Sequence, residues 1–462
     1  MQIDKAKLHL QKVDAQVEAF TVGNDYVLDR RLIEADCFGS AGHAAGLRKI
    51  GFLKDDEYDQ LLDGLREIVA RSRANEFDIA REQEDVHTAI ESHLTATKGD
   101  VGKRIHAGRS RNDQVVCATR IFTKWEMLRL AGAVKRLVDV ALAFAEKHAG
   151  VPMVGRTHMQ RAMPSSVGLW MGALAEALVD DLDLLWAAFD LNDQSPLGSA
   201  ASYGVPIPLD REFVAEALGF RKVQNNVIYV ANTRGKIEAA VLNACVQIMV
   251  DLSRYAQDIM LFSMPEFGYF SVPIEFCTGS SIMPQKRNPC VLELVRARTA
   301  TVMAEHDRLL TIVKGLPTGY NRDGQETKEP FMKGLDVTMA CVGIMAPTID
   351  RLEVNEDKLL AGFHPEVFAT DVALELVVGG TPFRDAYREV KQKLDSLGDM
   401  DPRAALAKKT HVGTTGNLRL EVPRASLDAH AARIDNETSR ARAAFKTLMS
   451  VDGPAALDTA HE

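Results

Sequence analysis

The chain carries its densest set of reactive side chains in an eleven-residue stretch between two helix-like segments. Residues 279–289 read GSSIMPQKRNP and hold two hydroxyls, an amine, a guanidinium and two amides. Pro284 and Pro289 prevent a continuous helix through this stretch, and most of its other side chains are polar. We therefore expect an exposed, mobile loop that is poorly ordered without a ligand.

The side chains of this loop suit the removal of a proton beside a carboxylate. Ser280 or Ser281 could act as a base if its alkoxide were stabilised. Lys286 could supply the positive charge for that alkoxide or for an enolate-like intermediate, and Asn288 adds a neutral amide for a carboxylate oxygen. A polar turn is the alternative interpretation, and composition alone favours it.

Two further segments place candidate binding groups at predicted helix starts. The stretch KRIHAGRSRNDQV sets Arg111 and Asn112 just before a long helix, where a carboxylate could bind. The stretch REQEDVHTAIESHLT sets Asp85 and His87 at the start of another helix. Helix capping is the alternative interpretation of the acidic and amide groups in both segments.

A third segment separates two helical patterns by a constrained turn. Residues 151–166 read VPMVGRTHMQRAMPSS, and their prolines and glycine leave Thr157 and His158 in that turn. A lone histidine more often makes a structural hydrogen bond. His158 is therefore a functional candidate only in combination with the other segments.

Together these segments resemble one family of enzymes. GSSIMPQKRNP resembles the signature loop of the fumarase/aspartase superfamily, whose members eliminate a nitrogen or oxygen leaving group to release fumarate. HAGRSRNDQV resembles the argininosuccinate lyase branch of that superfamily. Gln285 agrees, because fumarases resemble MPGK and adenylosuccinate lyases resemble MPHK where this chain reads MPQK. The resemblance extends over essentially the whole chain.

The resemblance implies an activity and an assembly. It implies a carbon-nitrogen lyase of arginine biosynthesis that reversibly splits argininosuccinate into arginine and fumarate by β-elimination, without a metal or an organic cofactor. In the family, three subunits of a homotetramer contribute to each site. Activity is therefore expected to depend on assembly.

The resemblance also implies residue roles. Ser280 is the base, with Ser281 as a competitor that the sequence leaves open, and Lys286 stabilises negative charge. His158 is the general acid or relays a proton to it, and Glu293 orients that histidine. The implied substrate-binding residues are Asp85, His87, Arg111, Asn112, Thr157, Arg234, Asn288, Tyr320, Arg322, Gln325 and Lys328.

The segment that begins at Phe20 departs from the family pattern. Many relatives read F-N-A-S there and contact the substrate through the serine, whereas this chain reads FTVGNDYVLD. Gly23 or Asn24 is expected to stand in through its backbone or its amide.

The composition indicates a soluble protein of a reducing compartment. Lys+Arg 55 against Asp+Glu 64 gives a formal net charge of -9, which argues against a nucleic-acid-binding surface. The six cysteines contain no C-x-x-C pair, which favours free thiols over a disulfide framework or a zinc site. The first residues lack the apolar core of a signal peptide, and no apolar run reaches membrane-spanning length. A cytoplasmic location without membrane contact is expected.

Long helices must position the reactive segments. Apolar residues recur every three or four positions over 121–145, and similar patterns follow at 165–190, 236–262 and 291–314. Stripes of this length need partners beyond one short bundle. The tail from residue 440 is expected to fray. We expect an all-α protein with three mostly helical domains: an N-terminal domain (1–112), a central long-helix bundle that forms the core of a homotetramer (113–360) and a small C-terminal domain (361–462).

Two alternatives remain. Within the same fold, the chain could be an adenylosuccinate lyase or a fumarase, against which HAGRSRNDQV and MPQK argue. Outside catalysis, lens delta-crystallins resemble this family and are structural proteins. The presence of His158, Ser280, Lys286 and Glu293 favours an enzyme.

Overall fold

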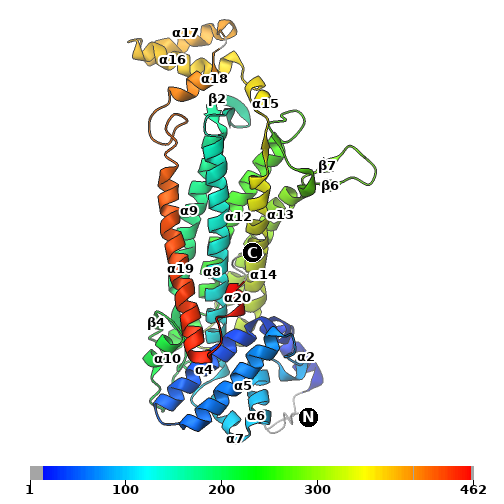
Figure 1. Ribbon diagram of the computed structural model, residues 1–462, viewed down its shortest axis with the longest axis vertical. Coiled ribbons are helices and arrows are strands. Elements are labelled where there is room, and N and C mark those ends of the chain that lie inside the picture. Colours follow the sequence, from blue (N-terminus) through cyan, green and yellow to red (C-terminus); the bar gives the residue numbers. More distant parts are fainter. Residues whose placement is uncertain (1–13, 399, 459–462) are drawn as a thin grey trace.

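Long helices run side by side along the longest axis of the protein (Figure 1). The computed structural model describes residues 14–398 and 400–458. The prediction of an all-α fold is confirmed, because helices dominate and the strands are short. The bundle consists of α8 (Arg111–Lys147), α9 (Val167–Asn192), α12 (Lys236–Phe262), α13 (Cys290–Val313) and α14 (Lys328–Asp350).

Polar side chains start the longest helix, α8, at a defined residue. Ser110 Oγ accepts a hydrogen bond from the backbone N–H of Asn112 (3.2 Å), and Asp113 Oδ1 accepts one from the backbone N–H of Ser110 (3.0 Å). These bonds satisfy donors near the start of the helix. Asp113 Oδ2 also accepts from the backbone N–H groups of Gly198 (3.0 Å) and Ala200 (2.9 Å). The loop after α9 is thereby fastened to the start of α8.

A layer of shorter helices packs across one end of the bundle (Figure 1). Leu61, Leu65 and Ile68 follow one another at helical spacing and are fully buried. This apolar stripe explains why their helix packs against its neighbours instead of standing in solvent. The layer contains α2 (Ala15–Val22), α3 (Asp25–Leu28), η1 (Asp29–Leu32), α4 (Ile33–Lys49), α5 (Asp55–Arg73), α6 (Val86–Lys98) and α7 (Asp100–Lys103).

A β-hairpin lies at the opposite end, where the sequence predicted a turn without strands. β1 (Pro152–Thr157) pairs antiparallel with β2 (Gln160–Ser166). The two turn residues, His158 and Met159, have φ values of 52° and 64°. Such values are uncommon for residues other than glycine and match the two-residue turns that suit hairpins.

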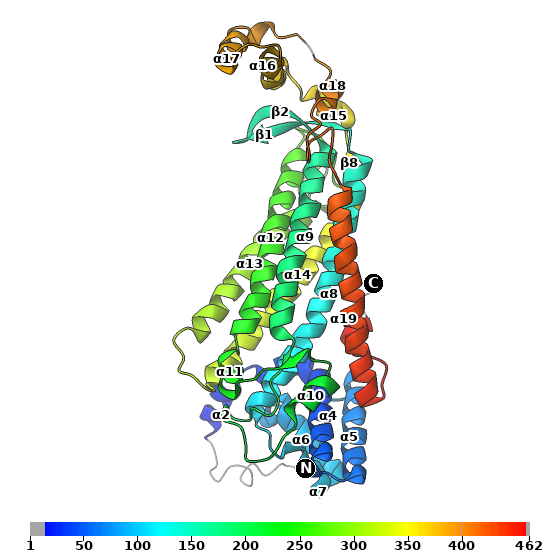
Figure 2. The ribbon, with the colours of Figure 1, turned by 90° about the vertical axis from the view of Figure 1, so that its left-hand side faces the viewer.

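Small helices continue this end of the molecule beyond the hairpin (Figure 2). The backbone N–H of Arg403 donates to Asp401 Oδ1 (3.0 Å), which caps one of them. These helices are α15 (Glu356–Ala361), α16 (Ala369–Val378), α17 (Phe383–Gln392) and α18 (Pro402–Ala407).

The last long helix, α19 (Glu421–Met449), returns along the bundle toward the N-terminal layer (Figures 1 and 2). Phe445 is fully buried, and its ring centroid lies 5.0 Å from that of Phe38 and 5.9 Å from that of Trp125. The prediction that the tail frays from residue 440 is therefore wrong for residues 440–458, and the last four residues lie outside the described part of the chain. Aromatic packing anchors the final turns of α19, and α20 (Ala455–Asp458) follows.

The remaining elements are short connections around the bundle. They include α10 (Arg211–Ala217) and α11 (Val227–Asn232), η5 (Arg322–Thr327), and the two-residue strand pairs β3 (Gln194–Ser195) with β4 (Lys222–Val223), β5 (Phe270–Ser271) with β8 (Glu353–Val354), and β6 (Thr278–Gly279) with β7 (Arg287–Asn288).

One described helical stretch, Arg322–Asp350, is long and apolar enough to cross a membrane by length and composition. The stretch is not an uninterrupted apolar run, because Lys333 and Asp336 lie within it. Half of its most apolar part is buried inside the protein. Buried core helices of soluble proteins pass the same test, so this stretch is weak support for a membrane span. Residues 1–13, which include most of the segment where no signal peptide is expected, lie outside the described residues.

Candidate active site

Nine of the eleven predicted substrate-binding residues line one cavity of about 140 Å³. Segments far apart in the sequence contribute them: the start of α6, the start of α8, the turn before α12, and the stretch around η5 that leads into α14. The nine are Asp85, His87, Arg111, Asn112, Arg234, Tyr320, Arg322, Gln325 and Lys328.

Asp85 and Arg111 bring two helix starts together at this cavity. Asp85 caps α6, since its Oδ1 accepts from the backbone N–H of Thr88 (2.8 Å). The capping interpretation of Asp85 is therefore confirmed. Arg111 Nη1 lies 3.5 Å from Asp85 Oδ2, which joins the first turn of α8 to that of α6. Burial opposes ionisation of Asp85, but His87 and Arg111 hold the pKa of its carboxyl below its ordinary value.

A buried polar network stands behind the cavity at His87. His87 is 4% exposed, and its Nδ1 is hydrogen-bonded to Asp36. Asp36 also accepts from Gln114 Nε2 (2.8 Å) and from Ser40 Oγ (3.1 Å). Burial opposes a charge on His87, but Asp36 and further carboxylates raise the pKa of its imidazole above the ordinary value. His87 Nε2 has no hydrogen-bond partner within the described part of the chain.

Lys328 is a buried cation shared by two carboxylates. Its Nζ lies 2.6 Å from Asp25 Oδ1 and 2.5 Å from Asp29 Oδ1. Burial opposes the charge, but Asp29 and Asp25 raise the pKa of Lys328. Asp29 Oδ2 accepts from the backbone N–H of Val86 (3.1 Å), which ties this group to the start of α6.

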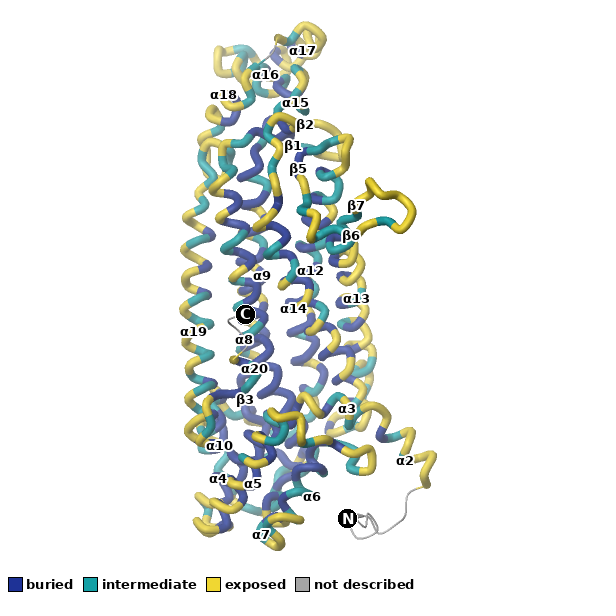
Figure 3. The backbone as a smooth tube through the Cα atoms, turned by 45° about the vertical axis from the view of Figure 1, so that its right-hand side comes forward, coloured by how far each residue is buried: buried dark blue, intermediate teal, exposed yellow. Residues whose placement is uncertain are grey.

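The predicted catalytic loop projects from the bundle, and Figure 3 shows it as an exposed arm beyond β6 and β7. Ser281 and Lys286 are exposed, while Ser280 and Asn288 are half-buried. Ser280 Oγ accepts from the backbone N–H of Met283 (3.1 Å) and, at a longer distance, from that of Ile282 (3.4 Å). The two backbone donors distinguish Ser280 from its neighbour.

The predicted residues Thr157 and His158 lie at the tip of the β1–β2 hairpin, and both are exposed. Glu293 is exposed in the first turn of α13. Within residues 14–398 and 400–458, no hydrogen bond or ion pair joins Glu293 to His158. The predicted carboxylate–histidine pair is not formed inside one chain.

The bundle separates these groups from the cavity. α8 has 37 residues, so the hairpin beyond its end stands about 55 Å from the cavity at its start. α13 has 24 residues, so the signature loop stands about 36 Å from the cavity end of that helix. One chain therefore collects most of the predicted binding residues but holds the four predicted catalytic residues elsewhere (Figure 1).

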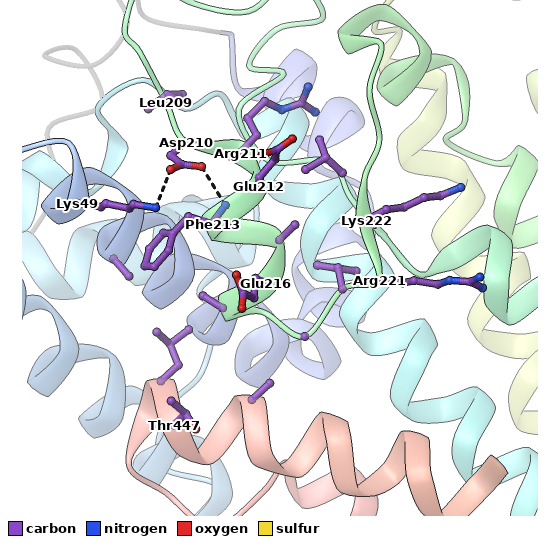
Figure 4. A pocket seen from close by; sticks show the side chains of 18 of the residues that line it. Lys49, Leu209, Asp210, Arg211, Glu212, Phe213, Glu216, Arg221, Lys222 and Thr447 are labelled. Atoms are coloured by element: carbon purple, nitrogen blue, oxygen red, sulfur yellow. Dashed lines mark hydrogen bonds and ion pairs between the residues drawn. The ribbon is translucent and has the colours of Figure 1, made fainter.

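A larger cavity, about 1800 Å³, contains none of the predicted site residues. It is an open groove between α4, α10 and α19 (Figure 4). One pair of its charged side chains is joined: Lys49 Nζ lies 2.8 Å from Asp210 Oδ2, and Asp210 Oδ1 accepts from the backbone N–H of Phe213 (2.9 Å). Size alone does not locate the chemistry in this protein.

Comparisons with known proteins agree with the motifs. The lyase family model matches residues 9–304. The argininosuccinate lyase of Thermotoga neapolitana is 44% identical over 381 residues, which make up 82% of this chain and 96% of that protein. The chain belongs to the argininosuccinate lyase family. Another family member, from Sorangium cellulosum, is 42% identical over 90% of this chain and 97% of its own.

Solved structures with lower sequence identity share the fold of this chain. An EDDS lyase in complex with formate has a TM-score of 0.81, 22% identity and 98% coverage of both chains. A fumarate lyase:delta crystallin from Brucella melitensis has a TM-score of 0.71 and 20% identity, covering 90% of this chain and 94% of its own. These likenesses support the fold alone.

Two carboxylates at this site were not among the residues predicted from the sequence. Asp25 lines the cavity, and Asp36 lies behind it. The spacing of Asp25 and Asp29 in DYVLD puts both on one helical face, which was an available signal. Asp36 carried no such signal, because the sequence does not reveal which interior carboxylate faces His87.

Proposed function

We propose that this protein is an argininosuccinate lyase that cleaves argininosuccinate to arginine and fumarate by β-elimination. Two observations support the proposal. Nine predicted binding residues line one cavity, and the chain is similar to argininosuccinate lyases over nearly the whole length of those relatives. Its lining mixes cations and carboxylates, as a substrate with carboxylates, an ammonium and a guanidinium requires.

The proposed chemistry begins with the loop serine. Ser280 removes a proton from the carbon next to a substrate carboxylate, and backbone donors at its Oγ help to stabilise the alkoxide. Lys286 stabilises the charge that develops on that carboxylate. His158 supplies a proton to the departing guanidinium nitrogen, directly or through a relay, and Glu293 orients the histidine. The bond between carbon and nitrogen then breaks and the double bond of fumarate forms.

We propose that several copies of the chain build each site. Proton transfer requires contact distances of about 3 Å, whereas the helices of one chain separate the cavity from the loop and the hairpin by tens of ångströms. A homotetramer in which the cavity, loop and hairpin come from three subunits removes this mismatch. The central bundle, residues 113–360, would form its core, with the domains 1–112 and 361–462 packed against it.

A substrate panel tests the activity directly. Purified protein is mixed with argininosuccinate, adenylosuccinate or malate, and the absorbance of fumarate is followed. We expect fumarate from argininosuccinate alone. Turnover of adenylosuccinate or malate without turnover of argininosuccinate would overturn the assignment, and inactivity toward all three would favour a structural protein.

Complementation tests the shared site. Ser280→Ala and His158→Asn should each be inactive as pure proteins, because every site lacks one group. After the two variants are mixed, dissociated and reassembled, some mixed oligomers contain sites with both native groups, and activity should return. A mixture as inactive as its parents would contradict sites built from different subunits.

The location proposed for the protein is the cytoplasm, without membrane or nucleic-acid partners. The net charge of -9 agrees with this choice. Fractionation of cells that express the full chain would test it, and recovery with the membrane pellet would contradict it.

A further inference from the structure

The segment that departs from the family pattern is held against the candidate cavity. Gln325 Nε2 donates to the backbone carbonyl of Thr21 (3.1 Å), and Arg322 Nη2 donates to the same oxygen (2.9 Å). Two side chains predicted to bind substrate therefore hold the end of α2. The backbone after Thr21 is consequently fixed beside the cavity.

Asp25, rather than Gly23, brings a functional group to the cavity. Gly23 has a φ of 52°, and a Cβ added to it would meet only Gln325 Nε2, at 4.0 Å. It offers no side chain to a ligand. Asp25 follows two residues later, lines the cavity, and has a side chain that is 13% exposed.

Asp25 shares its nearest cation with a second carboxylate. Lys328 contributes one positive charge to a group that contains Asp25 and Asp29. Burial raises the pKa of Asp25, Lys328 opposes that rise, Asp29 adds to it, and Arg234 opposes it more weakly. A buried carboxylate gains most from a further cationic donor, because the cavity offers it little water.

Other side chains at the cavity could bind a negatively charged group of a ligand. The guanidinium of Arg234 lies 5.9 Å from the centre of the Tyr320 ring, and in the described part of the chain no ion pair links Arg234 to a carboxylate. His87 Nε2, in a side chain that is 4% exposed, also has no partner there. The cavity therefore offers an acidic contact and cationic contacts, as a zwitterionic amino acid requires.

We propose that Asp25 is a specificity-determining residue that receives a cationic nitrogen of the arginine half of the substrate, in the segment that departs from the family pattern. This inference rests on the proposed function. The α-ammonium and the guanidinium share the required chemistry, a positively charged N–H donor, and the experiment distinguishes them. No bond is made or broken at Asp25, so its role lies in binding.

Steady-state kinetics of two Asp25 variants test the proposal. Asp25→Asn keeps the shape but removes the charge, and it should raise KM for argininosuccinate about ten- to a hundredfold, with a smaller change in kcat. Asp25→Glu should recover part of the affinity. Asp336→Asn is the matched control, because Asp336 joins η1 to α14 through Arg31 (2.8 Å) outside the cavity, and its KM should stay at the wild-type value.

Product analogues identify the nitrogen. Wild type and Asp25→Asn are titrated with arginine, with Nα-acetylarginine, which lacks the ammonium, and with citrulline, which lacks the guanidinium charge. If Asp25 binds the ammonium, the variant loses the preference for arginine over Nα-acetylarginine; if it binds the guanidinium, the variant loses the preference over citrulline. Either loss supports the proposal, and retention of both preferences overturns it.

The two hypotheses fail in different ways. A wild-type protein that does not cleave argininosuccinate overturns the proposed function. A wild-type protein that does cleave it, while Asp25→Asn keeps the same KM and the same analogue preferences, overturns the role of Asp25 alone. Circular dichroism and oligomer size of each variant separate a loss of binding from a loss of folding.

Discussion

Replacement of Asp36 by asparagine tests the polar network behind the cavity. Asp36 is 1% exposed and hydrogen-bonds to His87, Gln114 and Ser40. The asparagine side chain would keep the volume but lose the charge and exchange one acceptor oxygen for a donor. The imidazolium of His87 would then be buried without its carboxylate. Breaking such a buried pair costs about 3–5 kcal/mol, and we expect that loss in the free energy of unfolding.

The loss should depend on pH with a defined sign. Burial opposes the charge on His87, but Asp36 raises its folded pKa, so this contribution is present below the unfolded value of about 6.5 and is lost as pH rises through the raised pKa. Burial also opposes the charge on Asp36, but His87 lowers its pKa. That contribution is present above the unfolded value of 3.8 and is lost as pH falls through the lowered pKa. The pair is strongest between these two unfolded values.

Urea unfolding at pH 5.5 and pH 9, followed by far-UV circular dichroism at one subunit concentration, measures the effect. The deficit of Asp36→Asn relative to wild type should be larger at pH 5.5. The control is Asp336→Asn, whose surface ion pair with Arg31 should contribute about 0–1 kcal/mol. A deficit for Asp36→Asn no larger than that of the control, or one that is equal at both pH values, would refute the reasoning.

Three further predictions concern the loop, the last long helix and the interior of the bundle. Ser280→Ala should lower kcat about 10²–10⁴-fold with unchanged circular dichroism, whereas Ser281→Ala should stay active in the fumarate assay. An active Ser280→Ala and an inactive Ser281→Ala would assign the role of base to Ser281 instead. Phe445→Ala should lower the free energy of unfolding by about 3–5 kcal/mol, because the ring is fully buried, and an unchanged urea midpoint would contradict this anchor. Burial, followed by repulsion from neighbouring aspartates, raises the pKa of Asp181 to about 7. Since the folded pKa exceeds the unfolded value, this group makes the protein less stable as pH rises from about 4 to about 7. Asp181→Asn should therefore flatten the dependence of the unfolding free energy on pH in that range and raise the urea midpoint at pH 8. An equally steep pH dependence in the variant would contradict the prediction.

Three of the long helices were predictable to within a few residues. Apolar patterns at 165–190, 236–262 and 291–314 correspond to Val167–Asn192, Lys236–Phe262 and Cys290–Val313. Helix periodicity and capping are local properties, so the sequence contains them directly. The same holds for the start of α6, where Asp85 caps the helix as expected.

The hairpin and the last helix were less predictable for physical reasons. The β1–β2 turn uses His158 and Met159 at positive φ, without the glycine or asparagine that announces such turns. Phe445 anchors α19 through Phe38 and Trp125, which are distant in sequence. The composition near the end of the chain does not predict that contact.

The sequence by itself determined the helices, the family and the residue types of the site, because periodicity and motifs depend only on residues that are close together in the chain. Only the tertiary structure decided which of those residues meet. It joined Asp85, Arg111 and Lys328 at one cavity and kept Ser280 and His158 away from it. The reason is the rigidity of long helices: a loop at one end of α13 or a hairpin beyond α8 cannot reach a cavity at the other end. Asp25 and Asp36 likewise acquired their partners only when separate helices packed together.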